Sequence, residues 1–136
     1  MHGSISTKVV VEDATMTGHG HATTLEMVWR STDPLAVMLR LSAQPDHPAL
    51  PRGEWAVLRD FLRYGTTTPT GDGMVRIVPD GERVRLSLRG DVRPYAFAIP
   101  AAVLLAFLDE TDAIVPTGEE ASDADLDRLI ERLLDI

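Results

Sequence analysis

Three aspartates near the end of the chain have the alternate spacing of a calcium-binding loop. Asp123, Asp125 and Asp127 could supply the first ligands of such a loop, because Ca²⁺ prefers carboxylate oxygens. The same loop needs glycine at its sixth position and glutamate at its twelfth, where this chain has Arg128 and Leu134. The spacing therefore favours the negatively charged start of a helix, and we expect no metal site here.

Two closely spaced histidines, His19 and His21, could together contact a transition metal. They stand beside Gly18 and Gly20 in a segment typical of a turn, and this segment offers neither a third ligand nor a partner to orient the imidazoles. The chain contains no cysteine, which excludes disulfides, thiolate chemistry and cysteine-based zinc sites. We therefore predict that the protein holds no metal and no other cofactor.

Asp109, Glu110 and Asp112 form an acidic group that could act in acid–base catalysis. The apolar run at residues 101–108 predicts a helix, so these carboxylates fall at its C-terminal end, where the helix dipole disfavours negative charge. No nucleophile stands beside them. The pattern favours a solvated or partner-facing patch, and we predict no catalytic residues and no enzymatic activity.

The glycine-rich segment at residues 65–73 could hold a phosphate group through its backbone amides. It lacks the lysine of a P-loop, and it leads into an expected strand rather than into a helix. Gly71 and Gly73 instead favour positive φ or close backbone approach. The segment therefore predicts a structural turn.

Polar residues recur at alternate positions between residues 83 and 89, and most are arginines. Arg83, Arg85, Ser87 and Arg89 alternate with aliphatic residues, so a strand would place the guanidinium groups on one face, with Arg76 on the neighbouring strand. Proteins that bind single-stranded nucleic acids usually add stacking aromatic side chains, whereas only 5% of this chain is aromatic. A solvated or subunit-contacting face is therefore favoured, with nucleic-acid binding as the alternative.

The net charge of −8 is concentrated at the C-terminal end. Residues 1–100 carry 11 acidic and 11 basic side chains, whereas residues 101–136 carry 10 acidic side chains and 2 arginines. An acidic end repels phosphate backbones, which disfavours nonspecific nucleic-acid binding by the whole molecule.

Length and composition predict one globular domain over residues 1–136. The chain is 44% hydrophobic and 25% charged, which is ordinary for a folded protein of this size. It shows neither a signal-peptide pattern nor an apolar run of about 20 residues. We therefore expect a cytoplasmic protein without membrane insertion.

The positions of these side chains depend on an expected order of strands and helices. Residues 5–11, 23–29 and 35–41 are predicted strands, because β-branched and aliphatic residues alternate there between turns. After a proline-rich loop at 45–52, residues 54–58 could be extended. A short helical face around Leu58 and Leu62 is expected to end at Gly65 in a left-handed cap.

From residue 75 onward the sequence predicts further strands, followed by two helices. Residues 75–77 and 84–88 are predicted to form a hairpin, and residues 92–99 a further strand. Pro100 suits the first position of a helix, and Ser122 can cap a last helix with an apolar face. This face comprises Leu126, Leu129, Ile130 and Leu133. The order predicts an antiparallel, β-rich α+β fold of about seven strands, one short helix and two C-terminal helices.

Four sequence blocks carry a resemblance to a known family. They are residues 29–37, Trp55 with residues 59–62, residues 69–79, and residues 107–119 with Leu126 and Asp127. In this order they resemble the SsgA-like proteins, small sporulation and cell-division regulators of filamentous, spore-forming actinobacteria. Val78 and Leu39 stand where an aromatic residue is common in that family, so the resemblance does not specify a paralogue.

The resemblance implies both an architecture and a function. The implied fold is similar to the Whirly-type single-stranded nucleic-acid binders, assembled as a homotrimer with β-structure at its centre. The implied role is non-enzymatic control of septum-site selection at division septa. It would act by recruiting the tubulin-like protein FtsZ or the machinery of cell-wall synthesis or autolysis. A trimer presents each contact three times, which strengthens binding to a polymer.

Two surfaces follow as expectations. The hypothetical partner surface comprises the carboxylates of Asp109, Glu110, Asp112, Glu119, Glu120, Asp123 and Asp127. The alternative, a regulatory protein that binds single-stranded nucleic acid, would use Arg76, Arg83, Arg85 and Arg89. A small-molecule or calcium sensor is a third class, which these residues favour least.

Overall fold

Eight strands and two helices make up the computed structural model, which describes residues 3–13, 22–41, 53–71, 73–90 and 94–116. The first half contains β1 (Ser4–Asp13), β2 (Ala22–Arg30), β3 (Asp33–Leu41), β4 (Gly53–Leu58) and α1 (Arg59–Tyr64). The second half contains β5 (Thr70–Gly71), β6 (Val75–Asp80), β7 (Arg83–Arg89), β8 (Pro94–Pro100) and α2 (Ala101–Ile114). Each half is therefore four strands followed directly by a helix.

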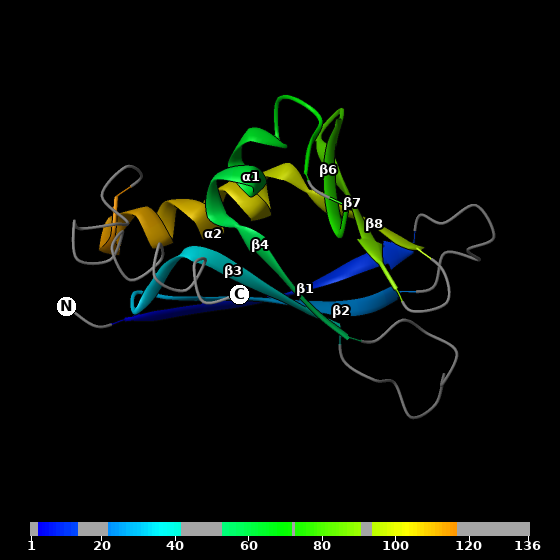
Figure 1. Ribbon diagram of the computed structural model, residues 1–136. Coiled ribbons are helices and arrows are strands. Elements are labelled where there is room, and N and C mark those ends of the chain that lie inside the picture. Colours follow the sequence, from blue (N-terminus) through cyan, green and yellow to red (C-terminus); the bar gives the residue numbers. More distant parts are fainter. Residues whose placement is uncertain (1–2, 14–21, 42–52, 72, 91–93, 117–136) are drawn as a thin grey trace.

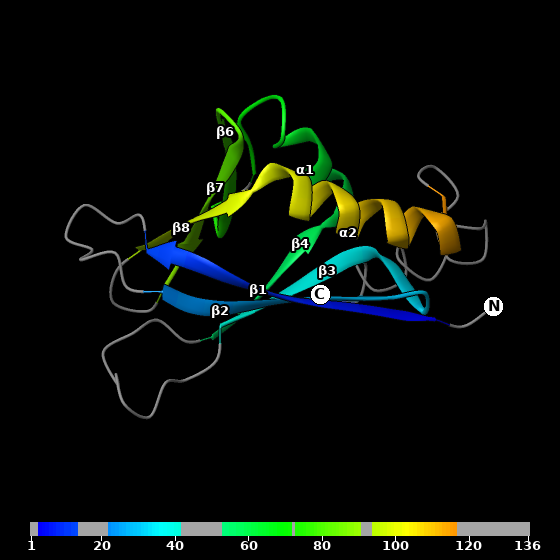
Figure 2. The ribbon, with the colours of Figure 1, turned by 180° about the vertical axis from the view of Figure 1, so that it is seen from behind.

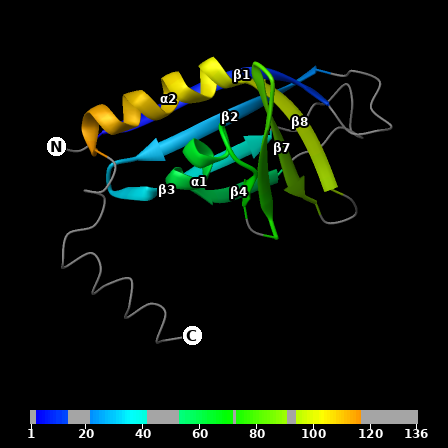
Figure 3. The same cartoon turned by 90° about the horizontal axis from the view of Figure 1, so that it is seen from above.

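The strands form one antiparallel sheet in the order β4-β3-β2-β1-β8-β7-β6-β5. Among the described residues, the strand pairing between the two halves consists of Glu12 with Ala98 and Asp13 with Phe97. Because this seam is so short, the two halves diverge, and both helices lie between them (Figure 1). The view from behind shows the same arrangement (Figure 2), and α2 runs along β1 when seen from above (Figure 3).

The core lies on the sheet face that is turned toward the helices. Inward positions alternate with outward ones, as a strand requires, and they bury Trp29 and Phe97 completely. Phe107 of α2 is 2% exposed and packs into the same cluster. Burying side chains of this size removes water from large apolar surfaces, each stabilising the fold by about 1.5–3 kcal/mol.

Trp55 links the edge strand β4 to the other half of the sheet. Its Nε1 donates a hydrogen bond of 2.9 Å to the backbone oxygen of Arg89, and its ring meets that of Tyr95 edge to face at 6.3 Å. Trp55 belongs to β4, whereas the other two residues belong to β7 and β8. This contact therefore curls the sheet around α1 and α2.

The structure confirms the antiparallel, β-rich α+β class and corrects its details. Eight strands are described, with β5 only two residues long, where about seven were predicted. α2 continues to Ile114, beyond the predicted run 101–108. The expected turn near residues 17–20 and the expected helix after Ser122 lie outside the described residues. The prediction of a single domain over residues 1–136 therefore stays a prediction.

The predictions for three glycines have different outcomes. Gly65 does cap α1, but with φ of −65°, so the predicted left-handed cap is wrong; its lack of a side chain instead lets the helix end lie against Ile77. Gly71 has φ of +149°, and an added Cβ would lie 2.2 Å from the backbone oxygen of Val75, as the sequence suggested. Gly73 has open space around it and no positive φ, so its requirement for glycine was wrongly predicted.

No described helix has both the length and the apolar content needed to cross a lipid bilayer.

Candidate functional site: an arginine–aspartate network between the helices

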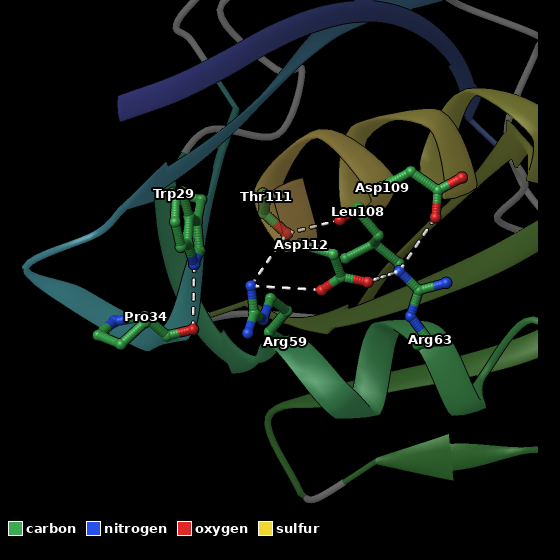
Figure 4. Close-up of polar contacts among 8 residues, drawn as sticks. All are labelled: Trp29, Pro34, Arg59, Arg63, Leu108, Asp109, Thr111 and Asp112. Carbon is green, nitrogen blue, oxygen red and sulfur yellow. Dashed lines mark hydrogen bonds and ion pairs between the residues drawn. The ribbon is translucent and has the colours of Figure 1, made fainter. Parts of the chain in front are cut away.

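The two helices are joined by a network of charged side chains (Figure 4). Arg59 and Arg63 are four residues apart on α1, so they project from the same helix face. Asp109 and Asp112 are three residues apart on α2 and likewise share a face. The packing of α1 against α2 brings the two faces together.

Arg59 is the buried member of this network, with a side chain only 2% exposed. Its Nη1 donates to Oγ1 of Thr111 at 3.2 Å and lies 3.4 Å from Oδ1 of Asp112. The guanidinium carbon also lies 5.5 Å from the centre of the Trp29 ring, a cation–π distance. A buried charge is costly without partners, so these contacts are what allow an arginine at this position.

The neighbours of Arg59 are themselves held in place. Thr111 Oγ1 donates to the backbone oxygen of Leu108 at 2.7 Å, which orients it to accept from Arg59. The indole Nε1 of Trp29 donates to the backbone oxygen of Pro34 at 3.0 Å. The network therefore connects the end of β2 and the start of β3 with the start of α1 and the last turns of α2.

Arg63 forms the outer part of the network. Its Nη2 lies 2.6 Å from Oδ2 of Asp112 and 3.3 Å from Oδ1 of Asp109. Asp112 thus contacts both arginines and is 28% exposed, whereas the side chain of Asp109 is 70% exposed. The inner contacts lock the helices together, and the outermost carboxylate faces solvent.

The chemistry of this network is structural. Within the described segments, no group of three or more His, Cys, Asp or Glu side chains could hold a metal ion. His19 and His21 and the aspartates at 123–127 lie outside those segments. What the network does is fix the last turns of α2 relative to the sheet.

The structure separates the residues of the predicted acidic surface. Asp109 and Glu110 are exposed on α2, whereas Asp112 forms ion pairs with Arg59 and Arg63 of α1. The other four predicted members, Glu119, Glu120, Asp123 and Asp127, lie outside the described residues. The assignment of this surface to a partner stays a prediction.

The predicted arginine face is formed on the second half of the sheet. Arg76, Arg83, Arg85 and Arg89 are all exposed, while the aliphatic residues between the last three are buried. β6 and β7 pair with Ser87 opposite Arg76, which places the four guanidinium groups on one outward face. The prediction of a shared face is confirmed, but its role is not tested.

Sequence reasoning missed the part played by Arg59 and Arg63. The four-residue spacing in a short helical segment was the available signal, together with acidic residues at a similar spacing further on. The polar partners of Arg59, Thr111 and Asp112, stand more than 50 residues away along the chain. Which arginine would be buried therefore depended on how α1 meets α2.

The fold and the network define a class of small α+β proteins in which two helices are clamped between the halves of an antiparallel sheet. The family model described as "Streptomyces sporulation and cell division protein, SsgA" matches residues 23–120. The chain therefore belongs to the SsgA family. Three of the four sequence blocks that carried the resemblance meet in the network, through Trp29, Arg59 and Asp112.

Individual relatives agree with this membership. The sporulation-specific cell division protein SsgB of Frankia casuarinae is 32% identical over 110 residues, covering 78% of this chain and 74% of that protein. SsgB of Streptomyces coelicolor is 36% identical over 85 residues, or 60% of this chain. The chain spans only 59% and 62% of the lengths of the Salinispora tropica and S. coelicolor proteins that it matches.

Solved structures are similar over a larger share of the chain. A structure of SsgB, described in connection with longitudinal cell division during sporulation of S. coelicolor, has a TM-score of 0.77 at 27% identity. The match covers 88% of this chain and 94% of the SsgB chain. An SsgA-like sporulation-specific cell division protein from Thermobifida fusca has a TM-score of 0.77 at 25% identity, covering 96% and 95%.

Proposed function

We propose that this protein regulates sporulation-specific cell division by binding other proteins, without catalysing a reaction. The observation that carries the proposal is the family match over residues 23–120. The name shared by the relatives, sporulation-specific cell division protein, supports the same role. In this role the protein would work in the cytoplasm at division septa.

The proposed mechanism is that of an oligomeric scaffold. The repeated order of four strands and a helix supports a Whirly-like architecture, and we infer a homotrimer with β-structure at its centre. A trimer offers the same weak contact three times, so it binds a polymer such as FtsZ, or an array of cell-wall enzymes, more tightly than a monomer does. Recruitment then requires only one modest contact per subunit.

The proposed contact surface is the exposed acidic side of α2. Asp109 and Glu110 project into solvent there, and the ion pairs of Asp112 hold that part of the helix in place. Glu119 and Glu120, which follow α2 closely in the chain, would extend the surface. Opposite charge on a partner would steer its approach and fix its orientation.

Neutralising Asp109 and Glu110 is expected to weaken binding to FtsZ polymers about tenfold, equivalent to ~1.4 kcal/mol. The variant Asp109→Asn/Glu110→Gln leaves Asp112 in place, so the helices should stay joined. The matched control is Asp80→Asn/Glu82→Gln, which removes the same two types of charge from the exposed β6–β7 turn. Co-sedimentation with FtsZ polymers at several salt concentrations measures the effect. Equal binding by both variants would reject this surface.

The arginine face supports a second candidate function, binding of single-stranded nucleic acid. Fluorescence titration with single-stranded DNA separates the two candidates. We expect only the weak, nonspecific affinity of roughly 10⁻⁴–10⁻⁶ M at physiological salt. Tight, salt-sensitive binding that is lost in Arg83→Gln/Arg85→Gln, but kept when the exposed Lys8 and Arg30 become glutamine, would favour the nucleic-acid function instead.

A further inference from the structure

The outward face of β2, β3 and β4 carries an apolar row. Val28 pairs with Met38, and Met38 pairs with Ala56, so the three side chains lie side by side across the strands. All three point away from the helices and remain partly or fully exposed. Beside them Ala36 pairs with Leu58, whose side chain is 46% exposed. This face therefore leaves a continuous apolar strip on the solvent side of the sheet.

The strip lies in a shallow hollow of about 350 Å³ that is charged at both ends. At one end Arg40 bridges Glu26 and Glu54 at 3.1 and 2.7 Å, which closes the hollow with an ion-paired row. At the other end the lining comprises Arg30, Thr32 and Asp33 around the β2–β3 turn. The hollow is thus apolar in the middle and bounded by charged groups.

α2 ends beside the turn that borders this hollow. The side chain of Ile114 lies over Gly3, where an added Cβ would be 3.0 Å from its Cδ1. Gly3 in turn exchanges two hydrogen bonds with Ser31 of the β2–β3 turn, at 2.7 and 2.8 Å. The end of α2 and this turn lie at the same end of the molecule in opposite views (Figures 1 and 2). The chain leaves the helix at Val115 in an extended conformation.

The length and pattern of the remaining chain suit this hollow. The six residues 116–121 can span roughly 20 Å when extended, twice the ~10 Å between packed layers, so they can pass around the sheet end. Residues 122–135 would form a helix about 20 Å long. Its apolar face consists of Leu126, Leu129, Ile130 and Leu133.

We propose that residues 122–135 dock as an amphipathic helix on the apolar row of β2, β3 and β4 in the same chain. A helix this short is marginal alone in water and needs an apolar surface to cover. Docking buries its four aliphatic side chains against Val28, Met38 and Ala56. Asp123 and Asp127 flank the apolar face and can approach Arg30 at the rim of the hollow. The helix then forms a second layer on the face opposite α1 and α2.

Cysteine cross-linking tests the proposal directly, because the chain has no cysteine of its own. The test variant is Ala56→Cys/Ile130→Cys, and the matched control is Ser87→Cys/Ile130→Cys, whose first site is on the outward face of β7. A disulfide forms only when the Cα atoms approach within about 7 Å. We expect the test pair to form an intramolecular disulfide at least about tenfold faster than the control, since docking raises the local concentration.

Two results would overturn the proposal. Equal rates for both pairs would mean that residues 122–135 do not prefer this face, and a disulfide that forms only between chains would mean that a second copy occupies it.

A dye-binding measurement provides an independent check. Leu129→Asp/Leu133→Asp should expose the apolar row and raise the fluorescence of a hydrophobic dye severalfold, whereas Ala124→Asp on the polar helix face should not. Unchanged dye fluorescence in the first variant would likewise contradict the docking.

Discussion

Replacing Arg59 with methionine is expected to lower the free energy of unfolding by about 3 kcal/mol. Methionine keeps most of the volume of the side chain but removes the charge that Asp112 faces and the group that Thr111 binds. It also removes the guanidinium beside the ring of Trp29. Equilibrium unfolding in urea, followed by circular dichroism, measures the loss.

Arg63→Met is the matched control for this substitution. Arg63 contacts the same Asp112 but is 32% exposed, and its second partner Asp109 is 70% exposed. Exposed ion pairs contribute little, so we expect a loss of less than about 1 kcal/mol. Arg59→Lys should remain destabilised, because an ammonium group cannot reproduce the planar set of donors. Similar losses for the Arg59 and Arg63 variants would show that burial does not set the value of this network.

Gly71→Ala is expected to destabilise the fold by about 2–3 kcal/mol through backbone strain and overpacking. Gly71 has φ of +149°, a conformation that side chains rarely adopt. Its added Cβ would lie 2.2 Å from the backbone oxygen of Val75 and 2.7 Å from Cα of Arg76. Backbone atoms cannot move aside as a flexible side chain can, so the β5–β6 pairing must shift. Urea unfolding measures the change in stability.

Gly73→Ala provides the comparison, with the same substitution two residues further along. An added Cβ at Gly73 meets nothing within 4 Å, and its φ is not positive. We expect a change within about 0.5 kcal/mol, because only the flexibility of the unfolded chain differs. A large loss at Gly73, or a small one at Gly71, would contradict the assignment of backbone strain to Gly71.

Most of the strands could be predicted from the sequence because their burial pattern is local. Alternation of apolar and polar residues marks β2, β3 and β7, where every second side chain is buried. Pro100 marked where α2 begins, but its predicted place as the first helical residue is wrong: it ends β8 and caps the helix with ψ of 129°, and α2 starts at Ala101. The outward arginine face followed from the same alternation. These features depend on spacing along one segment.

The glycines and β5 could not be predicted in this way. A glycine is compatible with a turn, a close approach or open space, and only the neighbours decide which applies. Gly65 was predicted to form a left-handed cap. Its actual φ is −65°, and a glycine is needed there because a side chain would collide with Ile77. β5 is recognised only because Thr70 and Gly71 pair with β6.

The sequence by itself determined the α+β class, the period of each strand and the concentration of acidic residues after residue 100, because these depend on residue order and composition alone. Only the tertiary structure decided that Asp112 belongs to a buried network with Arg59. It also decided that Val28, Met38 and Ala56 align in one row. The reason is that strand register and helix packing join segments far apart in the chain. In the strands, a shift of one residue would move Val28, Met38 or Ala56 to the other face.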